Sequence, residues 1–304
     1  MKLAQNLFEP AISEISAEHI NRPSTTMLQD AWRRFKLNKL AMVGLLTLLG
    51  LVVFTFIGPY LIHYNYFDND LMHQHLDPSW IHPFGTDELG RDSMARLMYG
   101  GRVSLAIGFV SVLINLAIGV PYGVISGYFG GKVDNIMMRI IDIIWSLPDI
   151  LYVILLMVIM GKGGLLTIML VLGIVNWMPM ARIVRGQILA LREQEYVLAA
   201  RTLGAKTSRL MIQHLIPNAV GPIVITSALA IPSAIFMEAF LSFIGIGIQP
   251  PFASWGSLAS DGRLNIPSYP YALFFPAIAI AITMLAFNFV ADGLRDAFDP
   301  KMRK

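Results

Sequence analysis

The sequence predicts an all-α polytopic membrane protein with six transmembrane helices and both termini in the cytosol. Three observations lead to this fold class. Hydrophobic residues make up 55% of the 304 residues and charged residues only 14%, whereas soluble domains carry about 25% charged residues. Several apolar stretches reach the roughly 20 residues that an α-helix needs to cross a bilayer. Lysine and arginine are also distributed unevenly between alternate loops.

The segment ahead of the first span predicts a short amphipathic helix. Its apolar face consists of Leu28, Trp32 and Phe35. Its basic face consists of Arg33, Arg34, Lys36 and Lys39. Such a helix can lie on the inner leaflet. A plain positively charged anchor without a mechanical role is the alternative. Residues 1–25 are polar and lack periodicity, so we expect them to be weakly ordered.

The chain divides into a cytosolic N-terminal segment (1–39), a transmembrane domain (40–292) and a cytosolic C-terminal tail (293–304). The predicted spans are Leu40–Ile62, Val103–Gly131, Ile140–Met160, Leu165–Ile183, Asn218–Ile248 and Tyr271–Val290. Pro148 in the third span, between Asp142 and Asp149, predicts a kinked or lipid-shielded helix. Four spans remain an alternative only if two kinked segments are re-entrant.

The orientation follows from the 23 lysine and arginine residues. With both termini inside, 18 of them lie on the inner side and 5 outside. The outer five are Arg91, Arg96, Arg102, Lys162 and Arg263. Because cytosolic loops carry the excess of these residues, an even number of spans with both ends inside is predicted.

The cytosolic stretch 187–217, between the fourth and fifth spans, has a helical pattern, and we call it the coupling hairpin. Its apolar stripe, with small residues at the centre, consists of Tyr196, Ala199, Ala200 and Leu203. Gly204 follows where a helix commonly ends in a left-handed conformation. A second helix, 206–216, is expected to end at Pro217. The hairpin can sit in a groove of a partner and transmit its motion, or it can lie on the membrane.

Two runs in the coupling hairpin, YVLAARTLG at 196–204 and HLIPN at 214–218, resemble the EAA loop of ATP-binding-cassette import permeases. The matching positions are Ala199, Ala200, Gly204 and Pro217. The departures are Leu198 in place of the acid that names the motif, His214 at its usual isoleucine and Ile216 at its leucine. The resemblance implies that this hairpin contacts an ATPase.

Four further runs resemble the C-type permease subunit of oligopeptide, dipeptide and nickel importers. They are GTDELGRD at 85–92, EAFLSFIGIG at 238–247, ASWG at 253–256 and GLRDAFDP at 293–300. The resemblance runs from about residue 30 to the C-terminus and is closest to the oligopeptide branch. It implies the type I ABC importer transmembrane-domain fold, in a bacterial plasma membrane protein that forms half of a translocation pathway for peptides.

The same resemblance implies several partners. These are a second homologous permease, two cytosolic ATP-binding-cassette ATPases and an extracytoplasmic peptide-binding protein, within a lipid bilayer. A dipeptide or nickel importer permease of the same family remains the alternative for the cargo. The net charge of +3 does not favour nucleic acid as a partner.

No catalytic residue, cofactor or metal is expected. Neither Gly131-Lys132 nor Gly161-Lys162 has the neighbours of a phosphate-binding loop, so ATP hydrolysis is assigned to the partner subunits. The chain also lacks the H-E-x-x-H and Gly-x-Ser-x-Gly motifs of membrane enzymes. An ion-coupled secondary transporter would show ionisable groups near the midplane or inverted repeats, and the sequence has one acid at that depth and no clear repeat.

Two further places attract functional hypotheses. Glu238 lies in the fifth hydrophobic region, where a carboxylate must be paired, hydrogen-bonded or exposed to water. We expect it to point inward, either lining the pathway or forming a structural or gating pair with a basic group of either membrane subunit. In the outer turn 85–92, Asp87 and Arg91 can pair and Asp92 can cap a helix that begins near Ser93. A structural role is favoured for this turn, and docking of an external binding protein is the alternative.

The outer loop between the first two spans is rich in possible metal ligands. They are His63, His73, His75 and His82, with Asp68, Asp70 and Asp77. Histidine ligands need converging geometry and oriented partners, and a polar loop of this composition needs no metal to explain it. No metal site is therefore predicted.

Overall fold

The computed structural model describes residues 26–160 and 164–299. The predicted N-terminal tail up to residue 25, Lys162 and residues 300–304 lie outside this description. Five helices are long and apolar enough to cross a membrane, and one bent pair gives a sixth crossing if it counts as a single span. The predicted all-α polytopic fold is confirmed for the described residues, which contain no strand.

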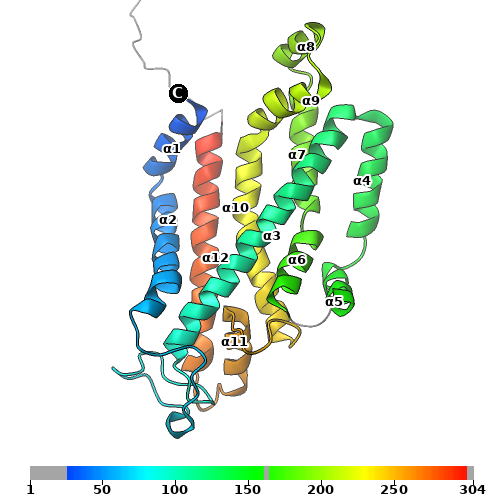
Figure 1. Ribbon diagram of the computed structural model, residues 1–304. Helices are drawn as coiled ribbons and strands as arrows, with labels where there is room; N and C mark the ends of the chain where they lie inside the picture. The colour runs from blue at the N-terminus through cyan, green and yellow to red at the C-terminus, as the bar shows by residue number, and fades with distance from the viewer. Residues whose placement is uncertain (1–25, 161–163, 300–304) are drawn as a thin grey trace, which may run out of the picture.

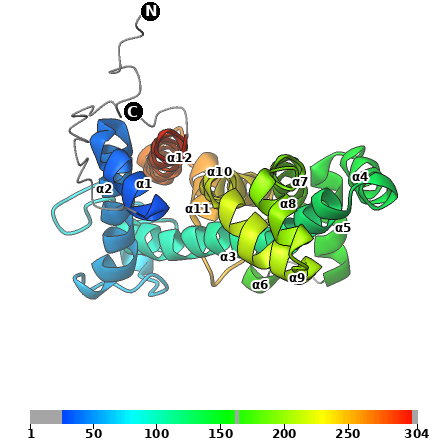
Figure 2. The same ribbon diagram turned by 90° about the horizontal axis from the view of Figure 1, so that it is seen from above.

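The helices stand side by side in a row, seen from the side in Figure 1 and from above in Figure 2. The row runs through α2 (Lys39–Val52), α12 (Tyr271–Phe298), α10 (Ile216–Phe243), α7 (Met178–Leu191) and α4 (Gly131–Trp145). Neighbours in the first part of the row pack on one another, α2 on α12, α12 on α10 and α10 on α7. This arrangement leaves large apolar areas at the surface, as a protein surrounded by lipid requires.

Helix α3 (Ser93–Phe129) has 37 residues and runs obliquely along one side of the row (Figures 1 and 2), where it contacts both α10 and α7. Its contact with α7 depends on glycines spaced four residues apart, Gly119, Gly123 and Gly127. A Cβ atom on Gly123 would lie 2.5 Å from the carbonyl oxygen of Ala181. The missing side chains therefore let the two backbones approach closely, as small residues do between membrane helices.

We expect Gly123→Ala to force α3 and α7 apart and to lower the free energy of unfolding by about 1–3 kcal/mol, as overpacking usually does. Gly186 of α7 is a matched control, because a Cβ atom there meets nothing within 4 Å. Gly186→Ala should raise stability by up to about 1 kcal/mol, since alanine favours helix over glycine. Thermal unfolding of the purified protein checks both, and equal midpoints for the two variants would contradict the packing argument.

The third predicted span consists of two helices. α4 and α5 (Asp149–Met160) are bent by 85° at the short break between them. Pro148 is the last residue of this break. It has no N–H to donate, and it disfavours a helical conformation of the residue before it. The expected kink is thus present, but the first helix already begins at Gly131, whereas the predicted start, Ile140, lies within it.

The fourth span also contains a break, but it continues in one direction. α6 (Leu165–Val175) and α7 follow each other and pass as a single crossing of 27 residues. The predicted end at Ile183 is therefore too early. Pro179 lies in the first turn of α7, where a helix does not use the N–H that proline lacks, so it helps to start this second helix.

The last two spans depart from their predicted ranges. The fifth, predicted as Asn218–Ile248, is one helical run from Thr207 to Phe243, so it starts earlier and ends earlier than predicted. Two prolines inside α10 do not end it, since membrane helices tolerate proline where neighbouring groups satisfy the freed carbonyls. α12 continues to Phe298, past residue 292, the predicted limit of the transmembrane domain.

The first described helix, α1 (Met27–Leu37), packs against the end of α12. Ala31 and Phe35 are buried there, and the Asn38 side chain donates to Asp296 at 3.0 Å. Trp32 remains half exposed beneath the ammonium group of Lys36, while the side chain of Leu28 lies outside the description. α1 and the end of α12 lie at the same face of the molecule (Figure 1), as an even number of crossings requires.

Candidate functional site

The coupling hairpin projects from the same face as the described ends of the chain (Figure 1). Its first arm is α8 (Glu195–Thr202). The second arm begins as α9 (Thr207–Arg209), continues as the π-helix η5 (Leu210–Leu215) and passes directly into α10. The hairpin is thus an extension of a membrane-spanning helix, and a displacement of its tip is carried into α10.

Gly204 forms the turn at the tip with a φ of +82°. Its N–H donates to the Arg201 carbonyl at 3.0 Å, and the next N–H, of Ala205, donates to the Ala200 carbonyl at 3.1 Å. These two bonds form a Schellman motif, which satisfies carbonyls that the end of α8 would leave free. A Cβ atom on Gly204 would meet nothing, so its left-handed conformation, and not a lack of space, explains the glycine.

The second arm does not end at Pro217, and this part of the prediction is wrong. In η5 the hydrogen bonds span five residues, and the Ile216 N–H donates to the Met211 carbonyl. Pro217 then stands in the first turn of α10. The wider π-turn changes the bonding register just before the proline, so the helix continues where an ordinary α-helix would break.

The predicted stripe of α8 is divided between two faces. Tyr196, Ala199 and Leu203 are exposed, and 88% of the Leu203 surface is accessible; we call these three residues the hairpin face. Ala200 is partly buried. Val197, for which no role was predicted from the sequence, is completely buried and anchors α8 in the cluster of the second arm. The hairpin therefore holds its own shape and leaves an apolar face without a partner among the described residues.

Two arginines fix the base of the hairpin, Arg192 within it and Arg185 in the preceding α7, and no such role was predicted for either. Arg192 donates to the carbonyls of Gly127 and Tyr128 at 2.9 and 3.2 Å, at the end of α3 where a helix leaves carbonyls free. Arg185 of α7 makes two bonds of 2.5 Å to Asp134 of α4. A bidentate pair of this kind is geometrically rigid. The hairpin is consequently tied to α3 and α4 as well as to α10.

Glu238 is completely buried, and its carboxyl group contacts three serine hydroxyls. Ser254 and Ser242 donate to Oε1 at 2.6 and 2.7 Å, and Ser104 donates to Oε2 at 3.5 Å. These serines belong to the cap of α11 (Trp255–Leu264), to α10 and to α3. Glu238 points inward. Among the described residues no lysine or arginine pairs with it, and its carboxyl group is held by hydroxyls that join three helices.

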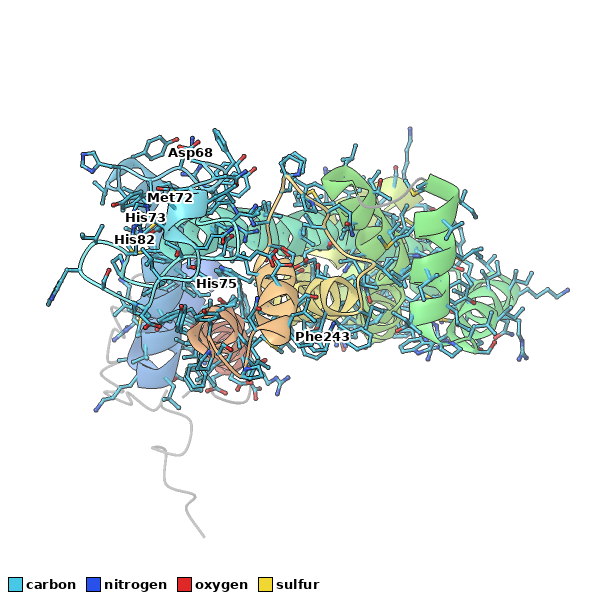
Figure 3. The ribbon with its side chains drawn as sticks, turned by 90° about the horizontal axis from the view of Figure 1, so that it is seen from below. Asp68, Met72, His73, His75, His82 and Phe243 are labelled. Carbon is cyan, nitrogen blue, oxygen red and sulfur yellow. The ribbon has the colours of Figure 1, made fainter. Side chains whose placement is uncertain are left out.

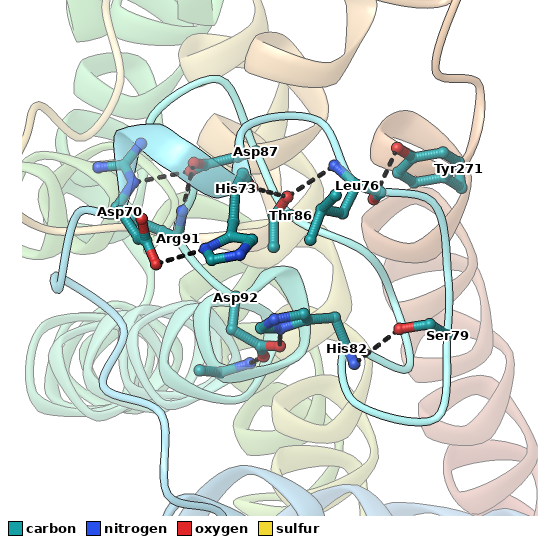
Figure 4. A network of polar contacts seen from close by, with 11 residues as sticks. Asp70, His73, Leu76, Ser79, His82, Thr86, Asp87, Arg91, Asp92 and Tyr271 are labelled. Atoms are coloured by element: carbon teal, nitrogen blue, oxygen red, sulfur yellow. Dashed lines mark hydrogen bonds and ion pairs between the residues drawn. The ribbon is translucent and has the colours of Figure 1, made fainter.

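The predicted pair in the outer turn forms, with Arg91 Nε 2.7 Å from Asp87 Oδ2 (Figure 4). Arg96 adds a second contact of 2.5 Å to the same oxygen. Burial raises the pKa of Asp87, but the two guanidinium groups and backbone N–H donors outweigh burial and hold this pKa below its usual value. Both partners of the predicted pair are about 15% exposed, so they shape the turn and offer little surface to another protein.

Asp92 caps α3 as predicted, accepting the Ala95 N–H at 2.7 Å. It also contacts His82 Nδ1 at 2.9 Å, while His73 Nδ1 lies 2.7 Å from Asp70 (Figure 4). His73 and His82 are thus paired with separate carboxylates, and His75 stacks on the Tyr269 ring. Within residues 26–160 and 164–299, no three histidine, aspartate or glutamate side chains are grouped as metal ligands would be.

Comparison with known proteins places the chain in a family. Residues 119–304 match the binding-protein-dependent transport system inner membrane component family, and residues 26–78 match the N-terminal TM domain of oligopeptide transport permease C. The chain is 51% identical over 303 residues to the oligopeptide transport system permease protein OppC of Bacillus subtilis (strain 168), with 99% of each chain covered. It is 53% identical over 289 residues to the dipeptide transport system permease protein DppC of the same strain, with 95% of this chain and 90% of that protein covered.

The fold is also found in a solved structure of the methionine ABC transporter MetNI in an inward facing conformation. The TM-score is 0.53 at 21% identity, over 66% of this chain and 94% of that chain. At this level of identity the likeness concerns the fold alone. The family match and the sequence relatives show that the chain belongs to the family of binding-protein-dependent transport system inner membrane components. It is a multi-pass permease subunit of the ABC importer type, a transport component and not an enzyme.

Proposed function

We propose that this permease forms half of the pathway of a peptide importer in a bacterial plasma membrane. The cargo is supported by its relatives, which are named as oligopeptide and dipeptide permeases. Membership of the family implies a partner permease and ATPase subunits. An extracytoplasmic binding protein would deliver the peptide, and the second, homologous permease would complete the pathway together with two cytosolic ATPases.

We further propose that the hairpin face, Tyr196, Ala199 and Leu203, binds one of the ATPases. The observation that carries this proposal is an exposed apolar face on a hairpin that already has its own buried anchor, Val197. Because the second arm is continuous with α10, a rigid-body movement of the ATPase would rotate or shift a helix in the middle of the row. The small side chain of Ala199 allows a partner to approach the backbone closely.

The cargo is tested with the reconstituted complex of both permeases, both ATPases and the binding protein. Adding a short peptide should stimulate ATP hydrolysis and lead to its accumulation in proteoliposomes that contain ATP. A non-hydrolysable ATP analogue is the control for uptake, and nickel salts are the control for the cargo. Stimulation by nickel salts without stimulation by peptides would contradict the peptide assignment and favour a nickel permease of the same family.

A further inference from the structure

The outer loop 61–92 presents two strongly exposed apolar tips. The first tip is Leu71 and Met72, with exposed fractions of 64% and 89%, and the second is Trp80 and Ile81, with 102% and 67%. In Figure 1 this loop extends past the ends of the spanning helices, at the end of the molecule opposite the coupling hairpin. Fully exposed tryptophan is unusual on a surface that faces only water, and such side chains mark interaction sites.

Local hydrogen bonds hold the first tip in shape. Leu71 and Met72 lie in the short helix η4 (Leu71–His73), which Asp70 caps by accepting the Met72 N–H at 3.1 Å. The Asp70 N–H in turn donates to the Leu89 carbonyl at 3.0 Å. Gly90 packs against the backbone of Asp70, in a left-handed conformation that leaves no room for a side chain. The tip is therefore fixed to the inner part of the loop.

The second tip is held in the same way. Trp80 and Ile81 stand between Ser79 and His82, whose backbones are joined by a bond of 2.8 Å from the Ser79 N–H to the His82 carbonyl. The Ser79 hydroxyl accepts the His82 N–H at 3.1 Å, and the His82 ring is bound to Asp92 at the start of α3. Rigid aromatic side chains lose little entropy on binding, and tryptophan is among the commonest hot spots of interfaces.

A groove of about 450 Å³ separates the two tips, and its surroundings are acidic. Loop 61–92 contains six carboxylates and one arginine, Arg91, which is already paired with Asp87. Asp68 and Asp70 line the groove, and Figure 3 shows Asp68 beside Met72 and His73 on the outer face. The hydrogen bond from His73 lowers the pKa of Asp70, which keeps its charge negative at neutral pH.

We propose that the two tips and the groove between them are the docking site for the external binding protein, whose contact surface carries apolar hollows for the tips and a lysine or arginine for the groove. This inference rests on the proposed function. Anionic lipid headgroups do not suit the site, because its carboxylates repel them. A second copy of the same surface would place carboxylates against carboxylates. The proposal replaces the Asp87–Arg91 pair, which is too buried to be the main contact.

Binding of the purified binding protein to the reconstituted complex, without peptide, tests the docking site. Trp80→Ala and Met72→Ala should each weaken binding at least tenfold, because each removes an anchor. Leu264→Ala is the matched control: Leu264 is 74% exposed on α11 and should bind like the wild type. Assembly with the ATPases, followed by gel filtration, verifies folding. Wild-type affinity in both tip variants, or an equal loss in Leu264→Ala, would overturn the proposal.

A second measurement identifies the occupant. The chain has no cysteine, so Gln74→Cys, at an exposed position beside the first tip, accepts an environment-sensitive fluorophore and leaves both tips intact. Its emission should shift when the binding protein is added and should not change between neutral and anionic nanodiscs. A shift with lipid composition, or with complex concentration alone, would assign the tips to the membrane or to a second copy and overturn the proposal. If the proposed cargo is wrong, peptide uptake fails already in the wild type, whereas a wrong docking site leaves uptake normal in the tip variants.

Discussion

Leu203→Asp is expected to release the chain from its ATPase and to reduce peptide uptake to background. Leu203 is 88% exposed at the tip of the coupling hairpin, so the change should not disturb the folded chain. In a docked complex the same position would bury a carboxylate in an apolar contact, where an unpaired charge is strongly unfavourable. We expect the affinity for the ATPase to fall at least about 30-fold, which corresponds to the loss of a hot-spot residue.

Co-purification of tagged permease with the ATPase measures this effect, with uptake as the second readout. Leu264→Asp is the matched control, since this leucine is 74% exposed on α11, away from the hairpin. Gly204→Pro should cause a similar loss by a different route, because proline cannot adopt the φ of +82° at the turn. If Leu203→Asp permease co-purifies with as much ATPase as the wild type does, the hairpin face is not the contact.

Glu238→Ala should lower the free energy of unfolding by about 3–5 kcal/mol, because it removes the common acceptor of three buried hydroxyls. Each hydroxyl left unsatisfied costs roughly 1–3 kcal/mol, and relaxation of the surrounding side chains offsets part of the sum. The hydroxyls come from α3, α10 and the cap of α11. Ser104 also accepts the Trp255 N–H at 3.1 Å, so the damage should extend to the start of α11. Thermal unfolding of the purified chain measures the loss.

Glu238→Gln separates hydrogen bonding from charge. Oε1 accepts from both Ser242 and Ser254, so an amide oxygen can take its place, and the amide nitrogen can donate to Ser104. Stability should therefore fall by less than about 1.5 kcal/mol, the usual net contribution of one hydrogen bond. If glutamine destabilises the chain as much as alanine, the negative charge is required, and the hydroxyl cage is not a sufficient explanation.

Features that depend on neighbouring residues could be predicted from the sequence. The apolar lengths predict the spans, and the end of α8 at Gly204 follows from the left-handed conformation that glycine adopts easily. The capping of α3 by Asp92 and the pairing of Asp87 with Arg91 are equally local. The kink at Pro148 was expected because proline acts on its own turn. In each case the interacting groups lie within a few positions of one another.

Features that depend on packing could not be predicted in the same way. Helical spacing alone placed Ala200 in the exposed stripe, whereas the buried anchor Val197 is defined by residues of the second arm. Pro217 was expected to end a helix, because proline lacks the N–H that a helix interior uses. The π-turn that lets the helix continue leaves no signature in the sequence. The serine contacts of Glu238 could not be predicted either, because Ser104 lies 134 positions away and only the crossing of α3 over α10 brings it close.

The sequence by itself determined the class of this protein, its family and its number of crossings, which is six if the bent pair is one span, and it predicts the orientation. Apolar length, charge bias and short motifs suffice for this because they are properties of contiguous residues. The tertiary structure alone decided which residues of the coupling hairpin are free for a partner, which groups hold Glu238, and that the Asp87–Arg91 pair is buried while Met72 and Trp80 are exposed. These outcomes depend on which distant helices and loops cover each side chain, and burial of this kind is not encoded in any local pattern.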